Sequence, residues 1–212
     1  MARARAICWT CSLTEVLGPH LAGRNLYLAR RLVPTSAGGR VNRQRILRDT
    51  LRQRQDTYVT TFFDLYGLPS DFPGPVASSA DPLERAAAIE EALHEEVVRV
   101  TQCRPDRFVP HIQPCEFEAL LFSDTSQFAR EQPAWAGSVA ELAVAGRRAG
   151  SPEHINDGSK THPSARLERL SGYRKVRDGT AVARRIGLCR IRRECAHFAD
   201  WVARLESLAA LG

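Results

Sequence analysis

In the first half of the chain, segments with apolar residues at helical spacing alternate with runs of β-forming residues. Apolar residues recur every three or four positions in Ser12–Asn25 and Val41–Gln55, which predicts two helices, the second with an arginine-rich wet face. Leu26–Pro34 and Tyr58–Phe63 are runs of β-forming residues, and the second run is apolar enough for a buried strand. Arg107–Gln113 is a third strand candidate, although a proline within it removes one backbone donor.

A helix with a well-marked start separates the last two of these strands. Asp81 is a natural N-cap, Pro82 occupies the first helical position, and Glu84 completes a capping box. The apolar stripe that follows continues to Val100. The order strand, helix, strand, helix, strand predicts an α/β fold with a mainly parallel sheet that helices cover on both faces.

The second half of the chain is predicted to be helical and rich in loops. A short helix at 116–122 precedes this part, which we place at 124–212. Residues 150–179 are polar and loop-rich, and 181–211 are mostly helical. A length of 212 residues suits one domain, so we predict a single α/β domain over 1–212 with an atypical start at 1–12.

Charge points weakly to a polyanionic partner. The formal net charge is +6 and the pI is about 9.3, and almost all of the basic residues are arginines, with Lys160 and Lys175 as the only lysines. A basic balance favours contact with nucleic acid. Apolar segments are too short for a membrane span of about 18 residues, so no membrane contact is predicted.

The start of the chain carries positive charge but no apolar run of signal-peptide length, which predicts a cytoplasmic location. The six cysteines are then expected to be thiols. Cys8 and Cys11 form a CxxC, but no second CxxC completes a zinc site, and Cys195 with His197 has no local partner. Half-buried thiols are therefore the favoured interpretation over metal ligands.

Three acidic residues beyond the predicted strands are the candidates for chemistry. Asp64 directly follows the strand that ends at Phe63, and Glu116 and Glu118 follow the strand that ends at Gln113. Ligands of open α/β sheets bind beyond the carboxyl ends of strands, so neighbouring strands would bring these carboxylates together. Such a group needs a cation or a proton between its members, and its oxygen ligands suit Mg²⁺ or Mn²⁺. Alternatively, the three residues only start a turn and serve a helix terminus.

Other polar residues are weaker candidates. Asp124 is either a further metal ligand or the N-cap of the next helix. His111 either points into the site and contacts phosphate or is a packed, hydrogen-bonded histidine. Lys160, Arg166 and Lys175 are candidates for contacts to phosphate or nucleic acid. There is no P-loop, GxGxxG or GxSxG, so these motifs support neither a nucleotide-binding protein nor a serine hydrolase.

Several stretches resemble a bacterial family, the domain of unknown function 4276, over roughly Leu13–Leu208. FDLYGLP and EFEALLFSD are the most specific of them. The stretches that carry the resemblance are Phe63–Pro69, Phe72–Gly74, Pro110–Gln113, Glu116–Asp124, Ser151–Glu153, Ile155–Asp157, Ile186–Leu188 and His197–Phe198.

That family is similar to the Toprim-like domains of nucleases of the overcoming-lysogenization-defect type. The resemblance implies a Rossmann-like Toprim sheet of about four strands and phosphodiester hydrolysis that depends on Mg²⁺ or Mn²⁺. It also implies an AAA- or ABC-type ATPase partner and a place in anti-phage defence. Asp64, Glu116 and Glu118 match the acidic residues that follow core strands in such a site.

One departure from the family pattern makes a second function a serious alternative. Family members open with a strand and a Val-Glu-Gly-x-Thr-Glu turn, which would fall near Arg5–Ile7, but no acidic residue precedes Glu15. The first strand is therefore expected to be missing or poorly formed. A chain without that glutamate would be an inactive, Toprim-shaped binding module rather than a nuclease.

Overall fold

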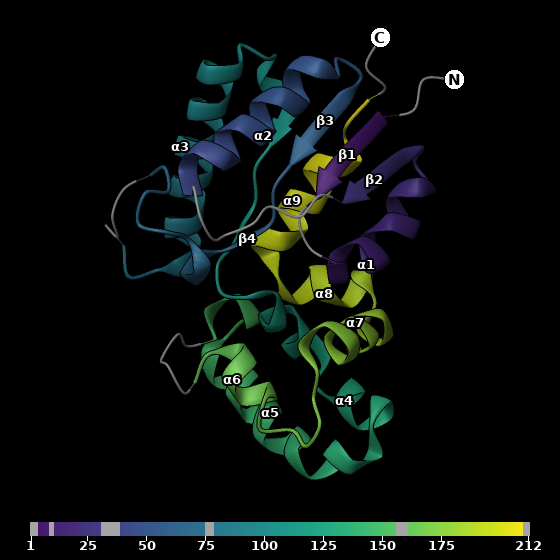
Figure 1. Cartoon of the computed structure of the whole chain (residues 1–212). Helices are drawn as coiled ribbons and strands as arrows, with labels where there is room; N and C mark the ends of the chain where they lie inside the picture. Colours follow the sequence, from purple (N-terminus) through teal and green to yellow (C-terminus); the bar gives the residue numbers. More distant parts are fainter. Residues whose placement is uncertain (1–3, 9–10, 31–38, 75–78, 156–160, 210–212) are drawn as a thin grey trace.

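The computed structural model shows a parallel sheet on one side of the molecule and a helical part on the other (Figure 1). It describes residues 4–8, 11–30, 39–74, 79–155 and 161–209. The sheet has four parallel strands in the order β2-β1-β3-β5. These strands are β1 (Ala4–Cys8), β2 (Leu26–Arg30), β3 (Thr57–Thr60) and β5 (Phe108–Val109). The predicted α/β class with a mainly parallel sheet of about four strands is thus confirmed.

Strand β1 corrects one expectation. Far from being missing, it lies inside the sheet, where Ala6 is opposite Leu28 of β2 on one side and Tyr58 of β3 on the other. Backbone hydrogen bonds to two neighbours define a strand here even though its sequence is a weak strand signal.

Helices cover both faces of the sheet, as predicted. Tyr58 belongs to the core under α1 (Cys11–Ala22) and α9 (Ala196–Glu206), whereas the next residue, Val59, belongs to a second core. That second core holds apolar residues of α2 (Gly39–Gln53) and α3 (Pro82–Thr101). Phe108 and Val109 of β5 divide between the two cores in the same way. Successive strand residues point to opposite faces, so this division shows a sheet buried on both sides.

Helix α3 begins as its sequence indicates. The side chain of Asp81 accepts a hydrogen bond of 2.8 Å from the backbone N–H of Leu83, and Pro82 is the first helical residue. The helix ends at Thr101, and the following residue, Gln102, caps it in a left-handed conformation with φ of 55°. Local sequence signals therefore set both ends of this helix within one or two residues of the prediction.

The strand predicted over Arg107–Gln113 is divided in two. After β5 the chain bends at Pro110 and His111, and β6 (Ile112–Gln113) leaves the main sheet to pair in parallel with β4 (Phe63–Asp64). The predicted strand Tyr58–Phe63 is divided at the same level. Two side-by-side breaks produce a small second sheet that lies beyond the carboxyl end of the first.

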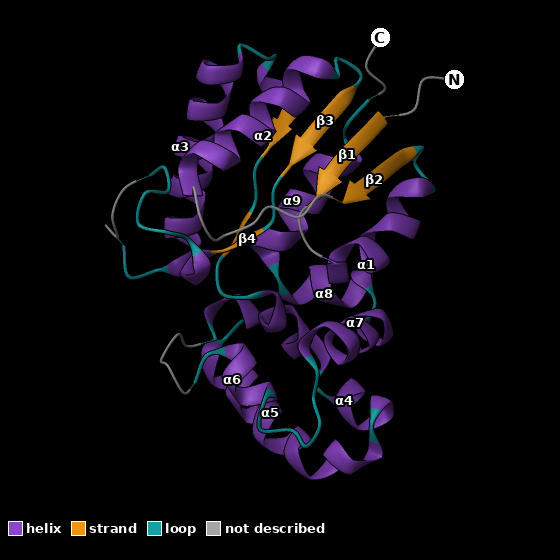
Figure 2. Cartoon of the chain, viewed as in Figure 1, coloured by secondary structure: helices purple, strands orange, loops and turns teal. Residues whose placement is uncertain are grey.

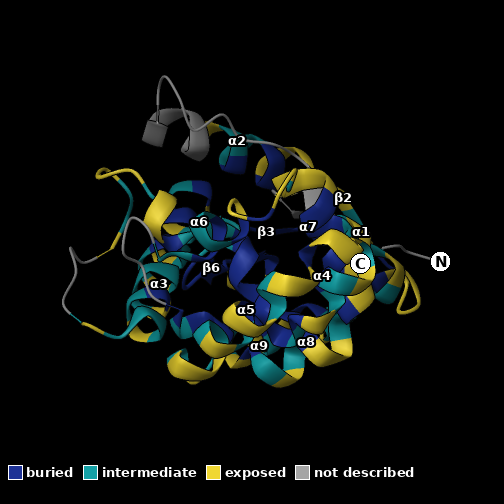
Figure 3. Cartoon of the chain, turned by 90° about the horizontal axis from the view of Figure 1, so that it is seen from below, coloured by how far each residue is buried: buried dark blue, intermediate teal, exposed yellow. Residues whose placement is uncertain are grey.

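The rest of the chain consists of helices and loops, and Figure 2 shows that no described strand lies in this part. Helix α7 (Lys175–Ile186) packs this part against α1, and one apolar core continues from α1 into it. Buried segments gather inside and exposed ones outside (Figure 3). The α-helices after β6 and before α9 are α4 (Ser126–Glu131), α5 (Ala136–Ala149), α6 (Pro163–Leu167), α7 (Lys175–Ile186) and α8 (Leu188–Glu194). The 3-10 helices are η1 (Leu65–Gly67), η2 (Pro105–Arg107), η3 (Phe117–Asp124), η4 (Pro133–Trp135) and η5 (Pro152–His154).

Within the described part of the chain, no helix combines the length and the hydrophobicity that crossing a bilayer would require.

Candidate functional site

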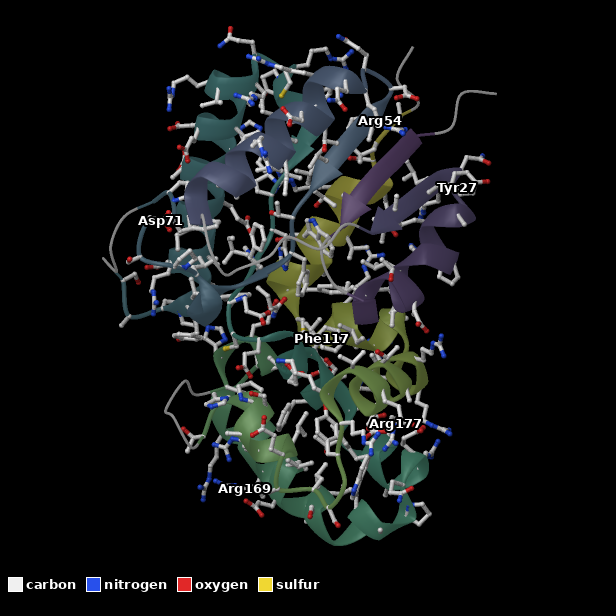
Figure 4. All side chains as sticks on the ribbon, in the orientation of Figure 1. Tyr27, Arg54, Asp71, Phe117, Arg169 and Arg177 are labelled. Carbon is white, nitrogen blue, oxygen red and sulfur yellow. The ribbon has the colours of Figure 1, made fainter. Side chains whose placement is uncertain are left out.

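The small second sheet places Asp64 at the start of the candidate site. Asp64 is opposite Gln113 in the β4–β6 pair, so the two strand ends are neighbours, which is the condition for the carboxylates to converge. Asp64 Oδ1 accepts a hydrogen bond of 3.1 Å from the backbone N–H of Phe117. Phe117, which is labelled in Figure 4, begins η3 and lies where the sheet meets the helical part. This bond ties the end of β4 to the segment that carries Glu116 and Glu118.

Glu118 is a buried carboxylate that pairs with a lysine. Its side chain is fully buried, and its Oε2 lies 2.8 Å from Nζ of Lys175, the first residue of α7. Its Oε1 has no hydrogen-bond partner among the described residues. The hydroxyl of Tyr173 is also buried without a described partner. An orphaned carboxylate oxygen in the protein interior costs free energy, and such a group calls for a cation or a proton.

Glu116 is held by the first turn of α6. Its two carboxylate oxygens accept hydrogen bonds from the backbone N–H of Ser164 at 2.9 Å and from the Ser164 hydroxyl at 3.1 Å. His162 Nδ1 lies 3.5 Å from Glu116 Oε2. Glu116 is therefore fixed in orientation, and each oxygen keeps a second lone pair for another ligand.

The electrostatics show that these carboxylates lie close enough to influence one another. Burial, with the negative charges of Glu118 and Glu116, raises the pKa of Asp64 to about 7, although Lys175 opposes the rise. Burial also raises the pKa of Glu118, again against the effect of Lys175. The pKa of Lys175 is itself raised, because the attraction of Glu118, Asp64 and Glu116 outweighs partial burial. One ammonium group thus serves three acids, which we call the carboxylate group.

The carboxylate group is nevertheless more open than a set of ligands that share one ion. Among the described residues, a single group of three His, Cys, Asp or Glu side chains has its ligand atoms all within 4.8 Å of one another, and it consists of other residues. Glu118 pairs directly with the ammonium of Lys175, whereas Asp64 and Glu116 interact with it through their charges. A shared cation would require side-chain movements and displacement of that ammonium.

The chain matches the model of one protein family, the domain of unknown function DUF4276, over residues 11–206. It belongs to that family. No curated protein matches the chain. Among solved structures, this DUF4276 chain is similar to the C-terminal region of the Burkholderia pseudomallei OLD protein, with 15% identity and a TM-score of 0.47 over 97% of this chain and 98% of that one. It is also similar to the C-terminal region of the Xanthomonas campestris pv. campestris OLD protein, with 14% identity and a TM-score of 0.41 over 96% and 97% of the two chains.

Asp124 has the contacts of a capping residue in this DUF4276 chain. Its carboxylate accepts hydrogen bonds from the backbone N–H and the hydroxyl of Ser126 and from the Gln127 amide. It ends the 3-10 helix near whose start Glu118 lies, and six residues of such a helix span about 12 Å. The N-cap of α4 is Thr125, so Asp124 lies one residue before the predicted cap position, although its carboxylate accepts from the first residue of that helix. No described contact joins Asp124 to the carboxylate group.

The four candidates for phosphate contact are in different situations. His111 is fully buried, so a phosphate in solvent does not reach it. Arg166 donates from Nε to the carbonyl of Thr161 at 2.6 Å and borders a pocket of about 530 Å³ that also contains Arg148 and His154. Lys160 lies outside the described residues. Lys175 alone of the four contacts the carboxylate group in the described structure.

The group that sequence reasoning missed is Glu90 of α3, His111 of the bend and His197 of α9, which we call the His–Glu cluster. These are the residues whose ligand atoms all lie within 4.8 Å. The neighbouring His111 and His197 outweigh burial and lower the pKa of Glu90 to about 2. The available signal was the pair of histidines in PHIQ and HF, but nothing in the sequence marks Glu90 among the acidic residues of α3.

Proposed function

We propose that this chain is a phosphodiester hydrolase that uses Mg²⁺ or Mn²⁺ bound by Asp64, Glu116 and Glu118. The observation that carries the proposal is the buried Glu118 Oε1, which has no described partner and lies in a group of three acids that share one ammonium. One positive charge does not balance three carboxylates, and oxygen ligands suit a hard divalent cation. The residues present therefore fit the ion that the family resemblance implies.

Each residue has a role that its contacts support. Asp64 and Glu118 would supply oxygen ligands, and Glu116, fixed by Ser164, would supply a third. Lys175 keeps about half of its side chain exposed, so it can turn outward and pair with a substrate phosphate. A bound divalent cation would activate water and stabilise negative charge.

We further propose nucleic acid as the substrate and an AAA- or ABC-type ATPase as the partner, in a role such as anti-phage defence. The family resemblance supports both, and the basic charge of the chain favours a polyanion. Arg169 and Arg177, labelled in Figure 4, lie at the periphery of the helical part. The arginines and the histidine of the 530 Å³ pocket give a further basic region.

The proposal is tested by incubating the purified chain with single- and double-stranded DNA and RNA and Mg²⁺ or Mn²⁺, with and without the ATPase. Cleavage should require the cation, and Asp64→Asn should lower its rate at least ~100-fold, the scale for loss of an electrostatic catalytic group. Asp200→Asn, on the exposed face of α9, is the matched control and should cleave normally. Cleavage that survives in Asp64→Asn or in a chelator would overturn the site.

One observation favours a second function, a non-catalytic binding module. No acidic residue precedes Glu15 in the sequence, and Glu15 pairs at the surface with Arg184 of α7. Salt-sensitive nucleic-acid binding without turnover under any divalent cation would support this function over hydrolysis.

A further inference from the structure

Three elements that are distant in the sequence bring their polar side chains together in the His–Glu cluster. Glu90 Oε1 lies 2.8 Å from His197 Nε2 and 3.4 Å from His111 Nδ1, and it accepts a hydrogen bond of 2.7 Å from the backbone N–H of Ile112. The cluster joins α3, the bend between β5 and β6, and α9. It shares no residue with the carboxylate group.

His111 presents a bare ring nitrogen to this cluster. Its Nε2 lies 3.2 Å from Gln113 Oε1, and an amide oxygen only accepts, so Nε2 carries the proton and Nδ1 presents its lone pair. Nδ1 is buried and makes no hydrogen bond to any described residue. A lone pair beside the carboxylate of Glu90 leaves two acceptors facing each other with nothing between them. A positive ion between these acceptors would stabilise both.

The environment of His111 holds the ring in that orientation. Its ring centroid lies 4.7 Å from that of Trp201, 5.0 Å from that of Phe62 and 5.0 Å from that of His197. Histidines that bind a metal usually donate their other ring N–H to a neighbouring acceptor, which sets the tautomer. The bond to Gln113 gives His111 this arrangement.

Two of the three ligand separations are close to those around a small tetrahedral ion. Ligands at ~2.0–2.1 Å from a tetrahedral centre lie about 3.3 Å from one another. The separation between Glu90 and His111 is already 3.4 Å, and the separation of 2.8 Å between Glu90 and His197 would open by about half an ångström. Two imidazoles and one carboxylate suit Zn²⁺, whereas Mg²⁺ prefers oxygen ligands alone.

We propose that Glu90, His111 and His197 bind one zinc-type transition-metal ion, at a site separate from the carboxylate group. Glu90 and His197 keep 12% and 16% of their side chains exposed, which gives the ion a route from solvent and leaves room for a water ligand. Glu153 accepts hydrogen bonds from the backbone N–H groups of His197 and Phe198 and so fixes the start of α9 behind the site.

The ion would stabilise the segment that positions Asp64. The carbonyl of His111 accepts a hydrogen bond of 3.2 Å from the backbone N–H of Phe63, the residue before Asp64. An ion that fixes His111 would therefore also stabilise the pairing of β4 with β6. This role is structural, and it is independent of whether the chain cleaves nucleic acid.

The full chain is stripped with a chelator, and Zn²⁺ and Co²⁺ are then titrated by calorimetry and by visible absorption. One ion per chain is expected, with the spectrum of tetrahedral Co²⁺ and a Zn²⁺-dependent rise in the thermal midpoint. Glu90→Gln has the same shape and should weaken binding at least ~100-fold, as loss of a ligand exceeds the effect of losing a supporting residue. Glu91→Gln, which is exposed on the same helix, should bind normally.

Three results would overturn the site. One is the absence of stoichiometric Zn²⁺ or Co²⁺ binding to the wild-type chain, which would mean that a proton bridges Glu90 and His197. Another is an intense near-ultraviolet charge-transfer band in the Co²⁺ form, which indicates thiolate ligands. The third is equal binding by Glu90→Gln, with His197→Gln as the second variant if Glu90→Gln does not fold. Asp64→Asn should retain the ion, and its loss there would place the ion in the carboxylate group.

Discussion

The carboxylate group and the His–Glu cluster place acidic residues of similar burial, Asp64 and Glu90, in opposite electrostatic situations. In the carboxylate group the charges of three acids act on one ammonium, and the pKa of Asp64 rises to about 7. In the His–Glu cluster one acid meets two imidazoles and a backbone N–H, and the pKa of Glu90 falls to about 2. Burial pushes both pKa values upward, so the neighbours decide the outcome.

The contrast shows which region depends on a proton or a cation from the solvent. Glu90 is ionised and hydrogen-bonded with the chain's own groups, so the cluster can stabilise the apo fold. Lys175 does not balance the charge of three carboxylates, so in the apo protein Asp64 is only partly ionised near neutral pH. A ligand that binds there must compete with that proton, whereas an ion at the cluster replaces a hydrogen bond.

The largest expected effect comes from removing Glu90. In chelator, Glu90→Ala should lower the free energy of unfolding by about 3–5 kcal/mol, because it leaves His197 and the Ile112 N–H without their acceptor in a partly buried site. Urea unfolding followed by tryptophan fluorescence measures the change. Glu91→Ala, exposed on the same helix, is the control and should change the value by under ~0.5 kcal/mol. Equal effects of the two variants would show that the cluster does not stabilise the fold.

The next prediction concerns pH. The contributions of the two regions to the free energy of unfolding should change with pH in opposite directions. The folded-state pKa of Asp64 lies above its ordinary value of 3.8, so its favourable contribution is complete below about pH 4 and declines until about pH 7. In chelator, Asp64→Asn should therefore gain stability relative to the wild type over this range, by up to ~4 kcal/mol. The contribution of Glu90 is instead present above pH 4.5 and is lost as the pH falls toward 2.

Unfolding curves of the wild type and of Asp64→Asn between pH 4.5 and 8 check this prediction. Saturating Mn²⁺ should remove the slope from the wild type, because a cation favours the ionised carboxylate. Parallel pH profiles for the two proteins would mean that Asp64 does not change its ionisation over this pH range.

Local sequence signals predicted those parts of the molecule that depend on local chemistry. Asp81 caps α3 as expected, and the strand-end position of Asp64 beside Gln113 follows from a parallel sheet. Strand β1 was not expected, because its existence depends on pairing with two neighbours and not on its own residues. Glu90 was missed for a similar reason, since its partners lie 21 and 107 residues away along the chain.

The region around Pro110 was predicted in part. The proline weakens a continuous strand, and the chain does bend there. The second, smaller sheet was not predictable from the proline. It forms only because the neighbouring strand breaks at the same level and the two fragments pair. That pairing is what brings Asp64 to the backbone of Phe117 and so begins the candidate site.

Removing the single cation of the carboxylate group should have a smaller effect on stability than the pH change. Lys175→Met keeps the length of the side chain but leaves the fully buried Glu118 without its positive neighbour, at a cost of ~1–3 kcal/mol. Because Lys175 opposes the rise in the pKa of Asp64, that pKa should rise further. Mn²⁺ should stabilise this variant more than it stabilises the wild type, since the ion no longer displaces an ammonium.

Thermal unfolding with and without Mn²⁺ measures that difference, and Arg177→Met, whose guanidinium pairs with Asp178 outside the carboxylate group, is the control. If Mn²⁺ stabilises Lys175→Met no more than the control, then the carboxylate group does not take a cation in place of Lys175. The binding-module function would then be favoured over hydrolysis.

The smallest expected effect is at Asp124. Its size distinguishes a residue that stabilises a helix terminus from a metal ligand. Asp124→Ala should cost about 1 kcal/mol, the usual scale for losing a side chain that accepts from the first N–H groups of a helix. Its affinity for Mn²⁺ should equal that of the wild type, because its contacts are to Ser126 and Gln127 and lie about 12 Å along η3 from Glu118. Calorimetric titration of Asp124→Ala beside Asp64→Asn makes the comparison. An equal loss of Mn²⁺ affinity in both variants would extend the carboxylate group to the far end of η3, and the ion would then bind between the two ends of that helix instead of around Lys175.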